Sequence, residues 1–271
     1  MKVKLAERVQ GPARPCVLVF AGLDPSGGAG IQADIEAIGA VGAHALPIVT
    51  ALTVQDNDRV FAVNPVEATI LQHQANVLTD KIRVAAVKIG IVGNRANAEA
   101  IADLIHGLRQ RQPELPVVLD TVLGSGHGYA LAEGGPEQAL ASLVALATLI
   151  APNLPEAARL CAGINGVEEQ ARHLLSLGSA NVLIKGGHGG GSTVVNRWFA
   201  QGETHSWNWP RLQGEFHGSG CTLASAIAGL LAQGMTMRSA LERAQAFCQH
   251  ALASSYAIAP GQRVPNRRHE R

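Results

Sequence analysis

Residues Gly214–Gly234, GEFHGSGCTLASAIAGLLAQG, decide how the rest of the chain is interpreted. A glycine-rich turn, His217–Thr222, leads directly into an apolar run with helical spacing, and Gly234 stands where a helix commonly ends. A helix that begins at such a turn leaves several backbone N–H groups without partners, and its dipole adds partial positive charge there. The pattern therefore predicts an anion-binding turn that suits phosphate.

Cys221 falls in the first turn of this expected helix, just after Gly218 and Gly220. The two glycines let the backbone approach a ligand closely. Because a thiol near a helix N-terminus tends to have a lowered pKa, we expect a reactive cysteine. A plainer interpretation stays open, in which the turn only precedes a buried helix and Cys221 is a small core residue.

The composition of the whole chain bounds the class of protein. Its 271 residues are 47% hydrophobic and 16% charged, which is typical of a soluble globular protein with a sizeable core. A net charge of +1 gives no reason to expect nucleic acid or an anionic membrane surface as a partner. No apolar run reaches the roughly 18 residues of a membrane-spanning helix, and the first residues lack the apolar segment of a secretory signal.

The cysteines and histidines indicate neither disulfides nor zinc. The four cysteines, Cys16, Cys161, Cys221 and Cys248, are scattered without paired spacing, so we expect reduced thiols in a cytoplasmic protein. The ten histidines form no HExxH or other zinc-ligand spacing.

Apolar runs that resemble buried strands alternate with helical patterns along the chain. The expected strands are 16–21, 45–54, 84–89, 117–119, 148–151 and 182–185. The expected helices are 31–41, 65–79, 95–109, 136–146, one after 156, one from 223, and a last pair between 233 and 257. This alternation predicts an α/β fold with a mostly parallel sheet and helices on both faces, to which residues 192–210 add an antiparallel hairpin.

No internal repeat or long linker divides the chain. We therefore expect a mobile leader at residues 1–15, a single domain at residues 16–258 and a disordered tail at residues 259–271.

A second glycine loop, Gly22–Gly30, follows the first expected strand and precedes a helix. That order suggests a nucleotide site, but the loop lacks the Gly-Lys-Ser/Thr ending of a P-loop and does not fit G-x-G-x-x-G. Asp24 and Asp34 would also repel phosphate at close range. The loop therefore favours a pocket for a neutral polar molecule, or else only a tight turn from strand to helix.

Polar residues gather where the expected strands end, and ligands bind at those ends in open α/β sheets. The residues are Asp24, Asp34, Gln55, Lys88, Asp120, Asn153, Glu156 and Lys185, with the Gly218–Cys221 turn. Each alone is ordinarily a helix cap, a turn residue or a solvated lysine. Together they supply charge neutralisation and an anion-binding turn, which suits phosphoryl transfer. Since Mg²⁺ takes one or two carboxylates, Asp120 and Glu156 are the candidate metal ligands.

Six segments carry a resemblance that runs in order from about Cys16 to Ala257 and so covers nearly the whole chain. They are Ala21–Asp34, Thr50–Gln55, Lys88–Gly90, Pro152–Ala157, Lys185–His188 and His217–Thr222. In this order they resemble the hydroxymethylpyrimidine/phosphomethylpyrimidine kinases of thiamine biosynthesis, in the ribokinase-like superfamily. The resemblance implies a three-layer α/β domain, ATP with Mg²⁺ as the phosphoryl donor, an aminopyrimidine alcohol or its phosphate as the substrate, and a homodimer.

The resemblance also implies roles for single residues. Those expected to bind or line the substrate are Gly22, Asp34, Gln55, Ile91 and Val122. Cys221 takes the base position that most of the superfamily fills with Asp. Gly218, Ser219 and Gly220 would stabilise the transferred phosphoryl group. The residues expected on the ATP side are Asn153, Lys185, Gly218 and Gly220.

Three positions depart from the family pattern. Thr121 replaces a common proline, Tyr129 replaces a common Asp, and Ala151 replaces a frequent Thr. The missing proline would loosen the backbone beside the expected metal site. A non-catalytic ligand-binding or regulatory relative would account for the first two departures, and it stays open as a third function.

A pyridoxal/pyridoxine kinase of the same superfamily is the second function, because a pyridine with a hydroxymethyl arm has a similar shape. Gln55 favours the aminopyrimidine, since its amide both donates to and accepts from that edge.

Overall fold

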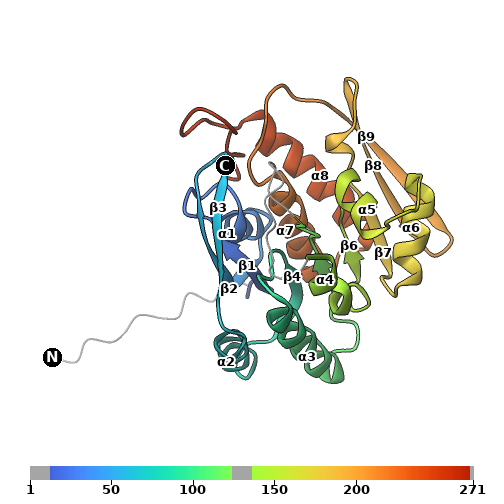
Figure 1. The fold of residues 1–271 in the computed structure, drawn as a ribbon. Helices are drawn as coiled ribbons and strands as arrows, with labels where there is room; N and C mark the ends of the chain where they lie inside the picture. The colour runs from blue at the N-terminus through green and yellow to red at the C-terminus, as the bar shows by residue number, and fades with distance from the viewer. Residues whose placement is uncertain (1–12, 124–135, 269–271) are drawn as a thin grey trace.

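The computed structural model describes residues 13–123 and 136–268, and its strands form one sheet (Figure 1). In space the strands follow the order β3-β2-β1-β4-β5-β6-β7-β8-β9. Their bounds are β1 (Cys16–Leu23), β2 (His44–Gln55), β3 (Val60–Pro65), β4 (Val84–Ile89), β5 (Val117–Leu119), β6 (Leu149–Ile150), β7 (Asn181–Ile184), β8 (Thr193–Ala200) and β9 (Glu203–Pro210). The strands from β2 to β7 in this order run parallel, whereas β3, β8 and β9 pair antiparallel.

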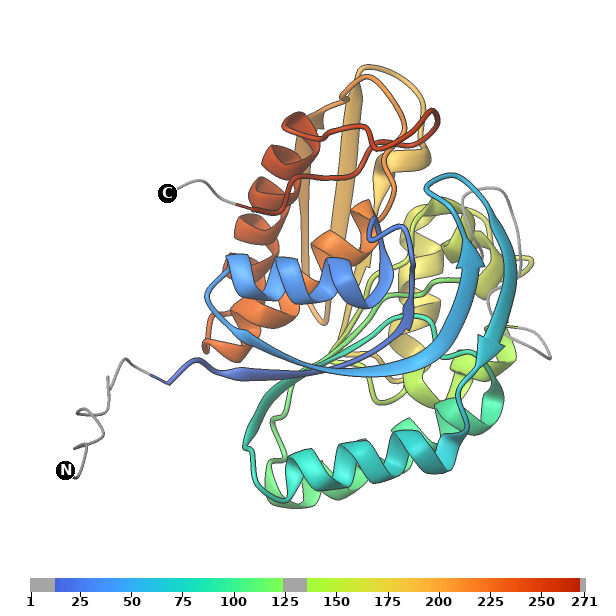
Figure 2. The same cartoon turned by 90° about the vertical axis from the view of Figure 1, so that its left-hand side faces the viewer.

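Helices cover both faces of the sheet, which Figure 2 shows from the side. Their bounds are α1 (Gly30–Ala40), α2 (Ala68–Thr79), α3 (Arg95–Arg111), α4 (Pro136–Val144), α5 (Leu154–Leu160), α6 (Val167–Ser176), α7 (Ser219–Ala232) and α8 (Met237–Ala253), with a 3-10 turn η1 (Gly186–His188). Helices α1, α7 and α8 pack on one face, and α2, α3 and α4 pack on the other. Among the described residues, no helix has both the length and the apolar character to cross a membrane.

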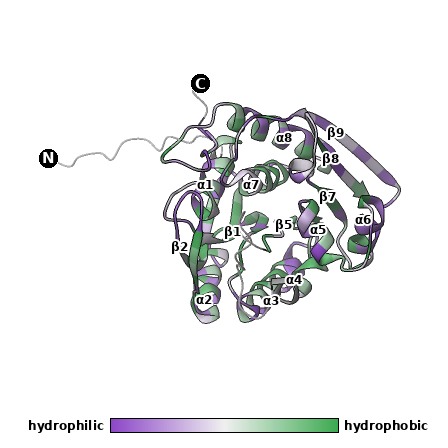
Figure 3. Ribbon diagram, turned by 45° about the horizontal axis from the view of Figure 1, so that its top comes forward, coloured by the Kyte–Doolittle hydropathy of each residue, from purple (hydrophilic) through white to green (hydrophobic). Residues whose placement is uncertain are grey.

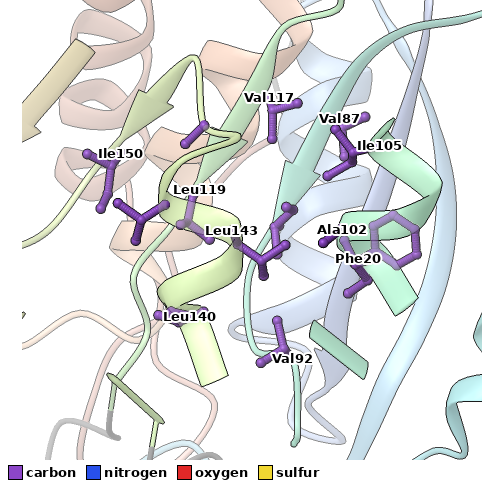
Figure 4. Packing of buried hydrophobic residues seen from close by; sticks show 14 of the residues in the cluster. Phe20, Val87, Val92, Ala102, Ile105, Val117, Leu119, Leu140, Leu143 and Ile150 are labelled. Carbon is purple, nitrogen blue, oxygen red and sulfur yellow. The ribbon is translucent and has the colours of Figure 1, made fainter. Parts of the chain in front are cut away.

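Strand β1 supplies both layers of the core. Val17 and Val19 belong to the cluster under α1 and α7, whereas Leu18 and Phe20 belong to the opposite cluster. Because successive side chains of a strand point to opposite faces, a strand covered on both sides is apolar throughout. Figure 4 shows Phe20 next to Ala102 of α3 in the cluster on that face. Figure 3 shows hydrophobic residues in the central strands and hydrophilic residues along β9 at the edge.

The architecture agrees with the sequence prediction: a mostly parallel sheet, helices on both faces and an added hairpin. Strand β3 was not expected. It is an edge strand in which Phe61 is 59% exposed, and its apolar run, Val60–Val63, ends after only four residues at Asn64 and Pro65. Helix α6 was also missed, and one helix, α8, stands where a helix pair was expected.

The C-terminal tail corrects another expectation. Residues 259–268 are ordered against the domain, so the prediction of disorder is wrong for them. Val264 forms an isolated bridge with Tyr256 and is 2% exposed, and Arg263 forms one with Phe216. The polar composition that suggested disorder instead supplies groups that bond to the domain. Residues 1–12 of the expected leader lie outside the described ranges.

Candidate active site

The expected site residues meet at the C-terminal ends of the parallel strands, beside the first turn of α7. Asp120 directly follows β5 and Lys185 directly follows β7. Gly220 faces both of them, because a Cβ built on it would lie 3.5 Å from Asp120 Oδ2 and 3.5 Å from Lys185 Nζ. The ends of β5 and β7 and the N-terminus of α7 therefore meet at Gly220.

The turn before α7 has the geometry expected of an anion site. Gly218 is the N-cap, with φ of 81°, and no side chain caps the helix, which begins at Ser219. The first-turn N–H groups are thus left for a ligand. A Cβ on Gly218 would lie 2.1 Å from the carbonyl oxygen of Gly28, so both its left-handed φ and this close approach require glycine.

Lys185 and Asp120 form a nearly buried ion pair. Lys185 Nζ lies 2.8 Å from Asp120 Oδ1, and the side chains are 13% and 2% exposed. Burial works against the Lys185 charge, but the charges of Asp120 and Glu156 outweigh it and raise the pKa of Lys185. Asp120 Oδ2 is buried and has no hydrogen-bond partner among the residues that the structure describes. The pair therefore keeps one anionic oxygen unsatisfied.

Glu156 is held beside this pair from two directions. With Asn153 it forms a capping box at the start of α5, in which each side chain accepts from the other residue's backbone N–H, at 2.9 Å and 2.8 Å. The hydroxyl of Thr121 donates to Glu156 Oε2 at 3.1 Å. Burial raises the pKa of Glu156, and the Asp120 charge adds to the increase. The departure at Thr121 thus supplies a new contact, whereas Tyr129 lies outside the described residues.

This donor set fits a magnesium ion rather than a fully protein-bound metal. Within the described ranges, no three or more His, Cys, Asp or Glu residues are grouped as a metal cage. Mg²⁺ keeps several waters and uses one or two carboxylates together with substrate phosphates. The unpartnered oxygen of Asp120 is the feature that such a cation would satisfy.

The expected substrate side lies around Gly22. A Cβ on Gly22 would contact Ile91 Cδ1 at 3.5 Å, so these two expected pocket residues are adjacent. Gln55 ends β2, and its Nε2 lies 3.3 Å from His217 Nε2. Val122 is partly exposed, and its N–H donates to the Asp120 carbonyl at 2.9 Å, which ties it to the phosphoryl side.

Sequence reasoning did not assign a role to His217. His217 Nε2 lies 2.8 Å from Asp24 Oδ2, so it joins the turn before α7 to the loop after β1. Burial opposes ionisation of Asp24, but hydrogen bonds from His217 and Ser26 outweigh it and lower the pKa of Asp24 to about 2. The signal available in the sequence was a histidine in the glycine turn before α7 together with Asp24 in the loop after β1.

Asp34, expected to bind substrate, forms a buried ion pair with Lys88. It is 0% exposed, and its carboxylate accepts from Lys88 Nζ at 2.8 and 2.9 Å and from the Ser225 hydroxyl at 2.6 Å. Burial works against the Lys88 charge, but Asp34 outweighs it and raises the pKa of Lys88. Asp34 is thus the anion of a buried ion pair between α1, β4 and α7, and both of its carboxylate oxygens accept hydrogen bonds within the protein.

The expectation of a lowered Cys221 pKa is wrong. Cys221 does lie in the first turn of α7 and is partly exposed. Burial of the thiol nevertheless raises its pKa to about 11, although the Lys88 charge works in the opposite direction. Desolvation of the thiolate therefore outweighs the helix N-terminus.

The solved structures that resemble this chain are ribokinase-like kinases. Pyridoxal kinase from Bacillus subtilis, solved with ADP, has a TM-score of 0.81 and 27% identity, covering 93% of this chain and 96% of its own. Phosphomethylpyrimidine kinase from Clostridium difficile has a TM-score of 0.74 and 31% identity, covering 88% and 100%.

The chain belongs to the phosphomethylpyrimidine kinase family, whose model matches residues 24–266. A hydroxymethylpyrimidine/phosphomethylpyrimidine kinase of Streptomyces coelicolor is 37% identical over 256 residues, which are 91% of this chain and 92% of the relative. The chain spans only 34% and 51% of two longer relatives, which are multifunctional and bifunctional thiamine biosynthesis proteins.

Proposed function

We propose that this chain is an ATP-dependent kinase that phosphorylates 4-amino-5-hydroxymethyl-2-methylpyrimidine and its monophosphate. One observation carries the proposal: the uncapped N-terminus of α7, the ammonium of Lys185 and the unpartnered oxygen of Asp120 meet at Gly220. Phosphoryl transfer depends mainly on positioning and charge neutralisation, which these groups offer. Family membership supports the substrate class.

On the phosphoryl side, the backbone would do most of the work. Gly218, Ser219 and Gly220 would direct N–H groups at the charge that develops on the transferred group. Lys185 would neutralise nucleotide phosphate, and Asn153, which caps α5 beside it, would complete the ATP side. These donors are already in place before a ligand arrives, so little reorganisation would be needed.

Asp120 and Glu156 would hold Mg²⁺, at least partly through water. The bound ion would neutralise phosphate charge during transfer. The two carboxylates are close enough for the Asp120 charge to act on the pKa of Glu156, which supports their sharing one cation.

On the substrate side, Gly22, Ile91 and Val122 would line the ring pocket. Gln55 would bind the aminopyrimidine edge, since its amide can donate and accept at once. In the free protein that amide contacts His217, whose ring is held by Asp24.

Cys221 would accept the proton of the substrate hydroxyl. With its pKa raised to about 11, the free protein holds a thiol at neutral pH, so the rate should increase with the thiolate fraction as pH rises. In a loose transition state the proton leaves late, which lowers the demand on the base.

A coupled assay of ATP consumption tests the function. We expect turnover with hydroxymethylpyrimidine and with its phosphate, and much less with pyridoxal. Equal or greater turnover of pyridoxal would make the chain a pyridoxal kinase. No consumption with any of the three would reject kinase activity and favour a ligand-binding relative.

Gln55→Leu tests the substrate side separately. The loss of a polar partner should weaken substrate binding by about 2–3 kcal/mol and so raise the substrate KM. The ATP KM should stay unchanged and is the internal control. An unchanged substrate KM would move the pocket away from Gln55.

Pyridoxal kinase remains the second candidate because of one observation. The Bacillus subtilis pyridoxal kinase matches the fold with a higher TM-score, 0.81, than the Clostridium difficile phosphomethylpyrimidine kinase, 0.74. Both identities are close to 30%, so neither match decides the substrate.

The remaining expectations concern assembly and location. A homodimer is supported by exposed apolar side chains on β2 and β3, including Leu52, Val54 and Phe61, and sedimentation would test it. A cytoplasmic location is supported by the four unpaired cysteines.

A further inference from the structure

The C-terminal tail carries a buried arginine that lies outside the expected site residues. Arg267 is 1% exposed. Its Nε donates to Thr222 Oγ1 at 2.7 Å, one terminal nitrogen donates to the carbonyl of Gly28, and the other lies 3.4 Å from Glu36 Oε2. A guanidinium tolerates burial only when its donors find acceptors in this way.

Two of these acceptors belong to the two glycine turns of the proposed site. The Thr222 hydroxyl that accepts from Arg267 donates in turn to the carbonyl of Gly218 at 2.8 Å. Gly28 lies directly against Gly218, since a Cβ on Gly218 would come within 2.1 Å of Gly28 O and 2.9 Å of Arg267 Nη2. The guanidinium therefore joins the two turns where they touch.

We propose that Arg267 is a positioning residue that holds the Gly22–Gly30 loop against the first turn of α7. The inference rests on the proposed function, in which the loop would bind the substrate and the turn would bind the transferring phosphoryl group. The two turns are far apart in sequence. The His217–Asp24 contact joins them at one place, but where Gly218 meets Gly28 neither glycine has a side chain to lock the approach. An error of about 1 Å between reacting groups can cost on the order of 10²-fold in rate.

The ion pair with Glu36 is the weaker part of this arrangement. Glu36 keeps 18% of its side chain exposed and shares its carboxylate with Gln32 and Arg268. Partly exposed pairs contribute little to stability. Arg267 thus acts mainly through its two hydrogen bonds to the turns, one to Thr222 and one to Gly28.

Kinetics of Arg267→Ala test the proposal. We expect kcat and kcat/KM to fall together by about 10- to 100-fold, with a nearly unchanged KM for ATP. Free guanidinium should restore part of kcat, because the substitution leaves a space of that shape. The matched control is Arg268→Ala, since Arg268 is 83% exposed and, among the residues that the structure describes, forms an ion pair only with Glu36, at 3.6 Å. It should retain wild-type kinetics.

Hydrogen exchange of the ligand-free protein gives a readout that does not depend on activity. In Arg267→Ala, peptides that cover residues 22–30 and 217–224 should exchange faster, whereas α3 (95–111) should not change. If Arg267→Ala does not fold, Arg267→Lys keeps the charge but loses the forked geometry, and the same two changes are expected in it. Wild-type kcat in the folded variant, or equal loosening of all segments, would overturn the proposal. If the wild-type protein consumes no ATP, the proposed function fails. Faster exchange in only the two turns of Arg267→Ala would then still support the positioning role of Arg267.

Discussion

Two lysine–carboxylate pairs make the same 2.8 Å contact in different surroundings. Lys88 and Asp34 are both 0% exposed, and the Asp34 carboxylate is saturated by Lys88 and Ser225. Lys185 keeps 13% of its side chain exposed, and within residues 13–123 and 136–268 Asp120 Oδ2 has no hydrogen-bond partner. A saturated pair has nothing left for a ligand, whereas an unsaturated pair beside an anion-binding turn does.

The difference also has an energetic side. A buried polar atom without a partner costs folding free energy on the order of 1–3 kcal/mol. Fully satisfied networks instead make a core rigid and specific. The Lys88–Asp34 pair thus behaves as scaffold under α7, and the Lys185–Asp120 pair carries a local cost that a bound cation and phosphate would offset.

The largest effect is expected from Lys88→Met. It leaves the Asp34 carboxylate buried with only Ser225 as a partner, so the free energy of unfolding should fall by about 3–5 kcal/mol. Urea denaturation measures the change. Replacing both members, as Lys88→Met with Asp34→Leu, should recover a large part of it, because an apolar pair of similar volume is often tolerated. If the single variant is as stable as wild type, the pair is not scaffold.

A slightly smaller effect, and on activity rather than stability, is expected from Lys185→Met. Loss of one cation aimed at developing phosphate charge should lower kcat/KM about 10²–10³-fold. Its free energy of unfolding should change less than that of Lys88→Met, because Lys185 is partly open to water. Wild-type kcat/KM in this variant would remove Lys185 from the site.

Charges from both pairs act on Cys221, which gives the third prediction. Burial raises its pKa from 9.0 to about 11. A raised folded-state pKa adds stability that is present below the unfolded pKa and lost as pH rises through the folded one. Between about pH 9 and 11 the wild-type protein should therefore lose about 2–3 kcal/mol that Cys221→Ser does not lose.

The Cys221→Ser comparison is needed because Cys248, whose pKa is raised to about 12, loses its proton in a neighbouring pH range and would contribute to the same loss of stability. Alkylation of Cys221 should still be accelerating at pH 9. A rate that levels off between pH 7 and 8 would contradict the raised pKa.

Sequence alone placed both members of the unsaturated pair at strand ends, although it did not pair them with each other. Asp120 and Lys185 each directly follow an apolar strand, and parallel strands bring such positions to one edge. The spacing of glycines before α7 likewise predicted the uncapped helix start. Local patterns suffice when the chemistry lies at the end of an element.

Sequence could not identify the saturated pair or the tail. Asp34 lies within α1, and only its packing against α7 brings Ser225 to its carboxylate. Arg267 looks like a residue of a polar tail until Thr222 and Gly28 supply acceptors from distant segments. The prediction of a lowered pKa for Cys221 failed for the same reason, because desolvation depends on tertiary packing that a motif does not encode.

The smallest effect is expected from Asp120→Asn, and it sharpens the comparison most. Asn keeps the shape and can still accept from Lys185, but it presents no anionic oxygen to a cation, so half-maximal rate should require about 10-fold more Mg²⁺. The matched control is Asp34→Asn in the other pair, which should lower stability and leave the Mg²⁺ requirement as in wild type. A Mg²⁺ titration of Asp120→Asn identical to wild type would exclude Asp120 as a ligand. An equal shift in both variants would mean that the two pairs differ in burial only, and that the unpartnered oxygen does not mark the metal site.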